Sequence, residues 1–558
     1  MGRGRQLAAA CLALALGGGP AAGWCASAGP ARASGAAAPR PAATAAAARG
    51  RAAAASDPVA ALESEVEQFL REREEANWDT WSNGAGSRQA EIYSRHPHLF
   101  TRETLARVRA AVARARAPQD KKALTYLRRF LEGEFVSQQA AVLEDSIANV
   151  MLSATVAVDT GRVPYFQISG WLSNQPDHAR RLAAYAAQDS VLDALKPLYQ
   201  ARLELVRREA ARLGYPSRFH FYQDQKGISF PELEREVRAF LSDTQGMYDT
   251  LLILLARDQL ALPAAEVRRA DINRINRLRG FDEYFPRDQL LPSLTRSFAD
   301  LGVDLSRQRN IRLDVEDRPG KNPRAACFAV HVPDDIRVSV EPVGGLQDYE
   351  AVFHEMGHAE HAAYTRQARI ELRSLGSSAF GECMAFAHEY LLEDPGWLAT
   401  HLQVERYDLQ HLAPQAAGLR LMLVRRYAGK FLYQMDLHRG GVKPEDAYLS
   451  NMRLALRYPM DEHDARRCYE DDEGFYEADY LQAWFLEAML VAHLEARYGP
   501  RYFQRREAGE ELKALWATGQ ELSGPELARR LGATHVDHRP LAAQLRAAIE
   551  GPVRAEGD

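Results

Sequence analysis

Two histidines four residues apart, with one glutamate between them and another farther along the chain, are the residues best suited to chemistry. His354 and His358 belong to the HEMGH sequence at 354–358, and Glu382 follows 24 residues after His358. Residues four apart lie on one face of a helix, so both imidazoles can bind the same metal ion. Two imidazoles, one carboxylate and an open fourth position are typical of a catalytic zinc site. We therefore predict one Zn²⁺ per chain, bound by His354, His358 and Glu382.

The elements that must position these side chains are two apolar helices. Residues 349–353 before the motif, and the alanines after it, indicate a buried helix rather than a surface helix with two solvated histidines. A buried helix must pair its polar groups, which a metal ion does efficiently. Gly357 is costly inside a helix and suggests the close approach of another backbone or a ligand. Residues 376–382 are predicted to be a loop that delivers Glu382 to a second helix at 383–392.

Two further glutamates have predicted roles at this site. Glu355, between the histidines, is the expected general base: it takes a proton from the metal-bound water and passes it to the leaving amine. Glu389 lies seven residues after Glu382, on the same helical face, and is our candidate for orienting a ligand histidine. The chemistry predicted from these residue types is hydrolysis, with peptide bonds as the expected substrate.

The motif also resembles a known family. The sequence HEMGHAEH at 354–361 is similar to the HExGHxxH of the thimet oligopeptidase and oligoendopeptidase F family, zinc peptidases of the HExxH gluzincin type. In that family a glutamate about this far downstream is the third ligand, which corresponds to Glu382. The angiotensin-converting enzyme family is a more distant match, since it shares HEMGH but typically lacks the histidine at 361. The resemblance implies hydrolysis of short peptides by a mainly α, two-lobed protein with a deep cleft and a small β-sheet beside the zinc helix.

A second stretch, at 475–484, resembles the tyrosine-rich helix that closes over the substrate in thimet-type peptidases. Tyr476 and Tyr480 are four residues apart and share a helical face. The resemblance implies that Tyr480 donates a hydrogen bond to the oxyanion and that Tyr476 contacts the substrate. Aromatic residues at this spacing are also typical of an ordinary helix core, and the sequence leaves both interpretations open.

The chain departs from the family just before Tyr476. The family usually has a histidine there, whereas this chain has acidic residues at 470–473, and His463 is too far upstream to replace it. Arg466 or Arg467 is an alternative oxyanion donor. Two other functions therefore stay open: a peptidyl-dipeptidase or carboxypeptidase that uses the same zinc, and a catalytically inactive, peptide-binding member of the same fold. The intact metal-ligand and base residues argue against the inactive protein.

Composition and the N-terminal segment predict the class and location of the protein. A net charge of −5 gives no case for a nucleic-acid partner, and basic clusters such as Arg268-Arg269 and Arg425-Arg426 are isolated. Residues 1–28, with arginines before an apolar stretch and Ala-Ser-Ala at the end, predict a secretory signal peptide. Lipoprotein anchoring at Cys25 is disfavoured by the tryptophan before it. We expect a protein exported to a periplasm or the exterior, with a disordered Ala/Pro-rich linker at 29–56.

Residues 57–558 are predicted to form a single helical catalytic domain whose zinc-site core spans about 321–500. We expect the mature chain to have no transmembrane segment and to be a monomer. Two short strands are expected at 326–332 and 336–340, with His331 on the strand surface. In the resembled family the edge of such a sheet pairs with the backbone of the substrate. Helical patterning predicts a first helix that begins after the N-cap Asp57. The same patterning predicts further helices at 102–115, 121–155, 178–213, 230–260 and 418–438.

Overall fold

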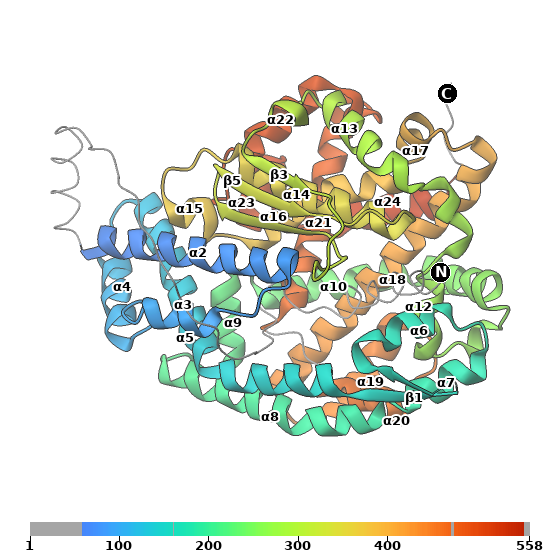
Figure 1. Ribbon diagram of the computed structural model, residues 1–558, viewed down its shortest axis with the longest axis horizontal. Helices are drawn as coiled ribbons and strands as arrows, with labels where there is room; N and C mark the ends of the chain where they lie inside the picture. The colour runs from blue at the N-terminus through green and yellow to red at the C-terminus, as the bar shows by residue number, and fades with distance from the viewer. Residues whose placement is uncertain (1–57, 160, 470–473, 552–558) are drawn as a thin grey trace.

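The structure, a computed structural model, describes residues 58–159, 161–469 and 474–551 and is mainly helical (Figure 1). The predicted signal peptide at 1–28, the linker at 29–56, the N-cap Asp57 and the acidic run at 470–473 lie outside the described residues. Among the residues that the structure does describe, every helix is too short or too polar to cross a membrane.

The elements follow one another along the chain with short 3₁₀ turns between many of them. The α-helices are α2 (Pro58–Asn83), α3 (Gln89–Arg95), α4 (Arg102–Arg114), α5 (Pro118–Ser153), α6 (Ile168–Asn174), α7 (His178–Ala186), α8 (Asp189–Arg212), α9 (Arg218–Lys226), α10 (Phe230–Asp243), α11 (Gln245–Leu255), α12 (Arg269–Ile275), α13 (Leu290–Asp300), α14 (Leu346–Tyr364), α15 (Ile370–Ser374), α16 (Ser378–Glu389), α17 (Pro395–Leu402), α18 (Arg406–Arg439), α19 (Pro444–Leu456), α20 (Glu462–Ala465), α21 (Tyr476–Tyr498), α22 (Arg506–Trp516), α23 (Gly524–Arg530) and α24 (Arg539–Glu550). The strands are β1 (Thr155–Val158), β2 (Gly161–Pro164), β3 (Ile311–Asp314), β4 (Ala326–His331) and β5 (Asp335–Ser339).

Several predicted helices are confirmed, and others differ in extent. The helices expected at 102–115 and 121–155 are α4 and α5. The single helix expected at 178–213 is wrong, because the chain breaks between α7 and α8 at Gln188. This buried side chain accepts a hydrogen bond from the distant Arg467 at 2.9 Å. The helix expected at 230–260 also breaks, at Thr244, whose hydroxyl accepts a bond from Arg425 at 2.7 Å.

The helix expected at 418–438 begins earlier than predicted. Helix α18 starts at Arg406 and continues through Pro414, although proline lacks the backbone N–H that a helix interior uses. The pairing of β1 with β2 in an antiparallel hairpin was not predicted.

The three-stranded sheet has the order β3-β5-β4, with β3 parallel and β4 antiparallel to β5 (Figure 1). The predicted strand pair is confirmed, and β4 is an edge strand. Side chains alternate across the sheet. Phe328 packs with Trp78 of α2 on one face, whereas Ile336 and Val338 join the main core with α14 on the other. The sheet therefore lies between α2 and α14, and its edge strand runs beside α14.

The main hydrophobic core gathers residues from 228 to 545 around α14, α16, α18 and α21. Helix α16 packs against α14 on one side and α21 on the other (Figure 1). Trp397, Trp484 and Trp516 are the largest fully buried side chains of this core. Smaller cores lie among the helices of the N-terminal half. The motif-bearing helices are thus held in the most extensively packed part of the molecule.

Candidate metal centre

Helix α14 carries the HEMGH motif, and its first turn is bonded to the segment before it. Asp348, in its first turn, accepts hydrogen bonds from the backbone N–H groups of Val343 and Gly344, each at 2.8 Å. An acidic side chain here also interacts favourably with the positive end of the helix dipole. The next residue, Tyr349, is fully buried and donates its hydroxyl to the carbonyl of Pro286 at 2.6 Å. These contacts fix the direction of α14 and hence of its histidines.

Helix α16 begins earlier than the sequence indicated. The expected loop at 376–382 is wrong beyond Ser377, whose hydroxyl accepts the backbone N–H of Phe380 and so caps the helix. Glu382 therefore extends from the second turn of a helix rather than from the end of a loop. The predicted close approach at Gly357 is confirmed: a Cβ at this position would lie 2.7 Å from Cα of Ala385 in α16.

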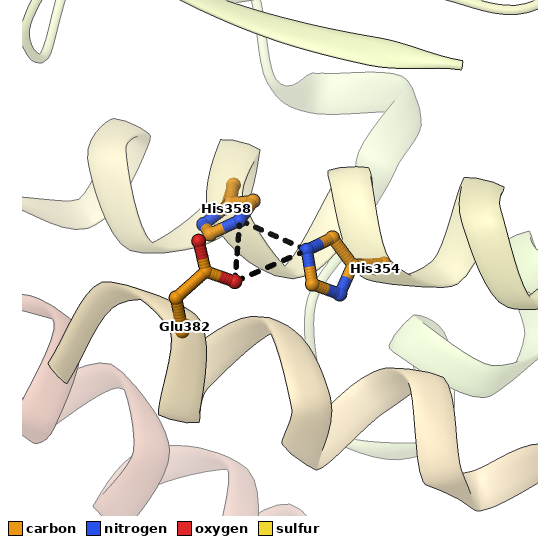
Figure 2. Close-up of side chains that lie close together, drawn as sticks. All are labelled: His354, His358 and Glu382. Atoms are coloured by element: carbon orange, nitrogen blue, oxygen red, sulfur yellow. Dashed lines mark hydrogen bonds and ion pairs between the residues drawn. The ribbon is translucent and has the colours of Figure 1, made fainter. Parts of the chain in front are cut away.

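The three predicted metal ligands converge in space (Figure 2). The Nε2 atoms of His354 and His358 are 3.1 Å apart, and Oε2 of Glu382 lies 3.4 Å and 3.7 Å from them. This oxygen is buried and has no hydrogen-bond partner among the described residues. A buried carboxylate oxygen without a donor is costly, and a cation between the three atoms would satisfy it. The donor set, two imidazole nitrogens and one carboxylate, fits zinc.

A second group of possible ligands, around His538, has no such buried oxygen without a hydrogen-bond partner among the described residues. Its ring nitrogens lie 2.7 Å from Glu236 and 3.0 Å from Asp243, and Asp537 forms an ion pair with Arg539 at 2.7 Å. These polar groups are paired with one another. Of these two groups of side chains, the one on α14 and α16 is therefore the better candidate for a metal centre.

Glu389 takes the predicted position behind the ligands. Its Oε2 lies 2.7 Å from Nδ1 of His354, so an N–H at Nδ1 donates to the carboxylate and leaves Nε2 free to bind a metal. Burial alone would lower the pKa of His354, but Glu382 and Glu389 together raise it well above its usual range. Burial lowers the pKa of His358 to about 4, helped by the charge of His354. The neutral imidazole that a metal requires is thus already favoured at His358.

Glu355, between the two histidines in the sequence, is bonded to the edge strand of the sheet. The backbone N–H of Cys327 in β4 donates to its Oε2 at 2.7 Å. Burial raises the pKa of Glu355 to about 7, against the lowering effects of His354, Cys327 and Arg324. A carboxylate with a pKa near neutrality is well matched to accepting and returning a proton.

The two tyrosines of α21 lie next to the ligand set and are also packed. Burial raises the pKa of Glu382, but the two histidines and the Tyr480 hydroxyl lower it below its usual range overall, which places that hydroxyl beside the ligand. The rings of Tyr476 and Tyr480 are 4.5 Å apart. Tyr480 also contacts the ring of Phe386. Tyr480 thus packs against α16, and its hydroxyl lies beside Glu382. Its role as an oxyanion donor stays a prediction.

The alternative oxyanion donors are engaged elsewhere. His463 bonds Asp189 at 2.7 Å, and Arg466 forms ion pairs with Asp189 and Asp193 in α8. Arg467 donates to the hydroxyl of Tyr185 in α7 at 2.8 Å. His361, the last histidine of the motif, is buried and bonds the carbonyl of Gly519 at 2.8 Å, so it ties α14 to the C-terminal segment.

Sequence reasoning missed a buried acidic cluster behind the ligands. Arg420 forms ion pairs with Glu393 and Glu487 and lies 3.6 Å above the ring of Tyr390. Burial raises the pKa of Glu393 and of Glu487 to about 7. The only hint in the sequence is that Glu389 and Glu393 are four residues apart.

No protein-family model and no curated protein matches this chain.

Proposed function

We propose that this protein is a zinc-dependent peptidase that hydrolyses peptide bonds in short oligopeptides. The observation that carries the proposal is the convergence of His354, His358 and Glu382 beside a glutamate bonded to the sheet edge. One oxygen of Glu382 has no hydrogen-bond partner within the described ranges. We propose membership of the thimet oligopeptidase and oligoendopeptidase F family on the same residues, with the two-lobed cleft that such membership implies.

The residues around the ligands divide the chemistry between them. A bound zinc ion would supply Lewis acidity toward water and the scissile carbonyl. Cys327 holds Oε2 of Glu355, which leaves Oε1 to accept a proton from the attacking water and pass it to the leaving nitrogen. The Tyr480 hydroxyl, which lies beside Glu382, would donate to the carbonyl oxygen as negative charge develops there.

The edge of β4 supports a peptide as the substrate. A strand with one unpaired edge offers backbone donors and acceptors to an extended peptide. Glu355 is bonded to this same edge through Cys327, so a peptide paired along β4 would pass beside the general base. Binding through main-chain groups favours short unfolded peptides over folded proteins.

The test is cleavage of a mixed peptide pool, with products identified by mass spectrometry and zinc counted per chain. The samples are the wild type, a chelator-treated wild type, and the variants Glu355→Gln and Glu360→Gln. We expect internal cuts that disappear after chelation and in Glu355→Gln, which should still bind one zinc. Glu360 is on the same helix but bonds Gln308, so its variant is the matched control and should stay active.

Two outcomes would change the proposal. Stepwise loss of C-terminal dipeptides would indicate a peptidyl-dipeptidase with the same metal centre. Bound zinc in the wild type without any cleavage would contradict the enzyme and favour a peptide-binding protein.

A further inference from the structure

Arg324 stands just before the edge strand, and its backbone is fixed on both sides. The N–H of Asn322 donates to the carbonyl of Trp81 at 2.8 Å, and the indole N–H of Trp81 donates to the carbonyl of Arg324 at 3.0 Å. The N–H of Arg324 donates to the side chain of Asn322 at 3.0 Å. Helix α2 therefore holds this segment in place, and the Arg324 side chain starts from a rigid base.

The guanidinium of Arg324 has no partner within the described part of the chain. The residue is half-buried, and neither an ion pair nor a side-chain hydrogen bond is formed by it there. Neighbouring arginines differ: Arg318 is paired with Asp314, and Arg337 with Asp335 at 2.6 Å. A half-buried cation without a counterion is an available binding group for an anion.

This cation is close to the predicted reaction centre. Its positive charge is near enough to Glu355 to oppose slightly the rise that burial causes in the pKa of that carboxyl. Arg324 precedes Cys327, the residue that holds Glu355, by three positions, which along an extended chain is at most about 10 Å. That distance corresponds to about two or three residues of a bound peptide.

The direction of β4 relates Arg324 to one end of the substrate. Antiparallel pairing is the commoner arrangement of strands. A peptide paired antiparallel to β4 would run from His331 toward Ala326, with its C-terminal part nearest to Arg324. The residues beside Arg324 would then be those released with the leaving amine.

Resting on the proposed peptidase function, we propose that Arg324 selects substrates by binding a carboxylate on the leaving-group side of the scissile bond. That carboxylate is either the C-terminal α-carboxylate or the side chain of an acidic residue, two or three positions past the cleaved bond. Arginine suits this task because its planar guanidinium donates two parallel hydrogen bonds to a carboxylate.

The test compares three versions of one cleaved peptide: the free acid, the C-terminal amide, and a version with glutamate replaced by glutamine near the C-terminus. We expect the wild type to cleave the preferred carboxylate peptide about 10- to 100-fold better in kcat/KM than its neutral analogue, mostly through KM. Arg324→Gln should lose this preference, and Arg324→Lys should keep part of it. Arg318→Gln, whose arginine is already paired, is the control and should keep it all.

Peptide binding to the Glu355→Gln variant tests the role of Arg324 independently of the proposed peptidase activity. Affinities of the three peptides for zinc-loaded Glu355→Gln, with and without Arg324→Gln, are measured by calorimetry and need no turnover. A carboxylate preference that vanishes with Arg324→Gln supports the inference even if the wild type cleaves nothing. Equal affinities of the acid, amide and glutamine peptides would overturn it, while cleavage by the wild type would still support the peptidase.

Discussion

Replacement of Gly357 by alanine tests the contact that holds the two ligand-bearing helices together. The new Cβ would lie 2.7 Å from Cα of Ala385 and 2.9 Å from the carbonyl oxygen of Met384. Carbon atoms in contact are about 3.5–4.0 Å apart, so α14 and α16 would have to separate by about 1 Å. Both contacted atoms belong to the backbone, and no side-chain rotation can relieve the clash.

The cost of this change follows from two opposing effects. Alanine gains about 1 kcal/mol over glycine in a helix interior. An added carbon in a packed core costs about 1–3 kcal/mol, and the upper end applies here because backbone must move. We expect a net loss of about 1–2 kcal/mol in the free energy of unfolding. His354 and His358 lie on α14 and Glu382 on α16, so the ligand set is also pulled apart, and activity should fall about 10²-fold.

The assay compares Gly357→Ala with Gly381→Ala in urea unfolding, zinc content and peptide cleavage. Gly381 is also inside a helix, in α16, but its added Cβ would meet no atom within 4 Å. This control should therefore gain up to about 1 kcal/mol of stability and keep its zinc. If Gly357→Ala were as stable and as active as Gly381→Ala, the close packing of α14 on α16 would be refuted.

Three further changes test the surroundings of the ligands. Glu389→Ala removes the partner of His354 Nδ1, and we expect the zinc affinity to fall about 10- to 100-fold in chelator competition; an unchanged affinity would contradict the orienting role. Tyr480→Phe should lower kcat for peptide cleavage about 10²- to 10³-fold with little change in KM, whereas an unchanged kcat would leave this tyrosine only a packing role. Burial raises the pKa of Glu487 from 4.5 to about 7 in the folded, metal-free protein, although Arg420 lowers it. The folded state therefore keeps a proton that the unfolded state releases above pH 4.5, so stability falls as the pH rises from 4.5 through 7. In Glu487→Gln the free energy of unfolding should fall by about 2–4 kcal/mol less between pH 5 and pH 8 than in the wild type, as measured by urea unfolding. An identical pH dependence in the variant would count against the raised pKa.

The pairing of the two histidines could be predicted because its geometry is local. Four-residue spacing puts His354 and His358 on one face of any helix, whatever packs around it. Glu389 followed from the same helical periodicity counted from Glu382. The start of α16 was missed because glycines and serines at 376–381 resemble a loop, whereas Ser377 uses its hydroxyl to cap a helix.

The remaining features depend on contacts between distant parts of the chain. The helix breaks at Gln188 and Thr244 are accompanied by hydrogen bonds from Arg467 and Arg425, which lie more than 180 positions away. No local pattern contains such a partner. Arg324, whose guanidinium has no partner among the described residues, was missed for the same reason, since its relation to Glu355 requires the sheet edge to be placed beside α14.

The acidic cluster behind the ligands links the stability of the fold to the metal it is proposed to bind. Loss of solvent raises the pKa of Glu350 well above its usual range, and those of Glu393 and Glu487 to about 7, while Arg420 supplies a compensating charge to the last two. Glu389 connects this group to a ligand histidine. A divalent cation at the ligands would favour the ionised form of each carboxyl, so binding should release protons. By linkage, the same carboxylates must strengthen binding of the cation as the pH rises. At a pH where these carboxyls are ionised, their charge would strengthen binding of the proposed cation, whereas their raised pKa lowers the stability of the metal-free chain as the pH rises.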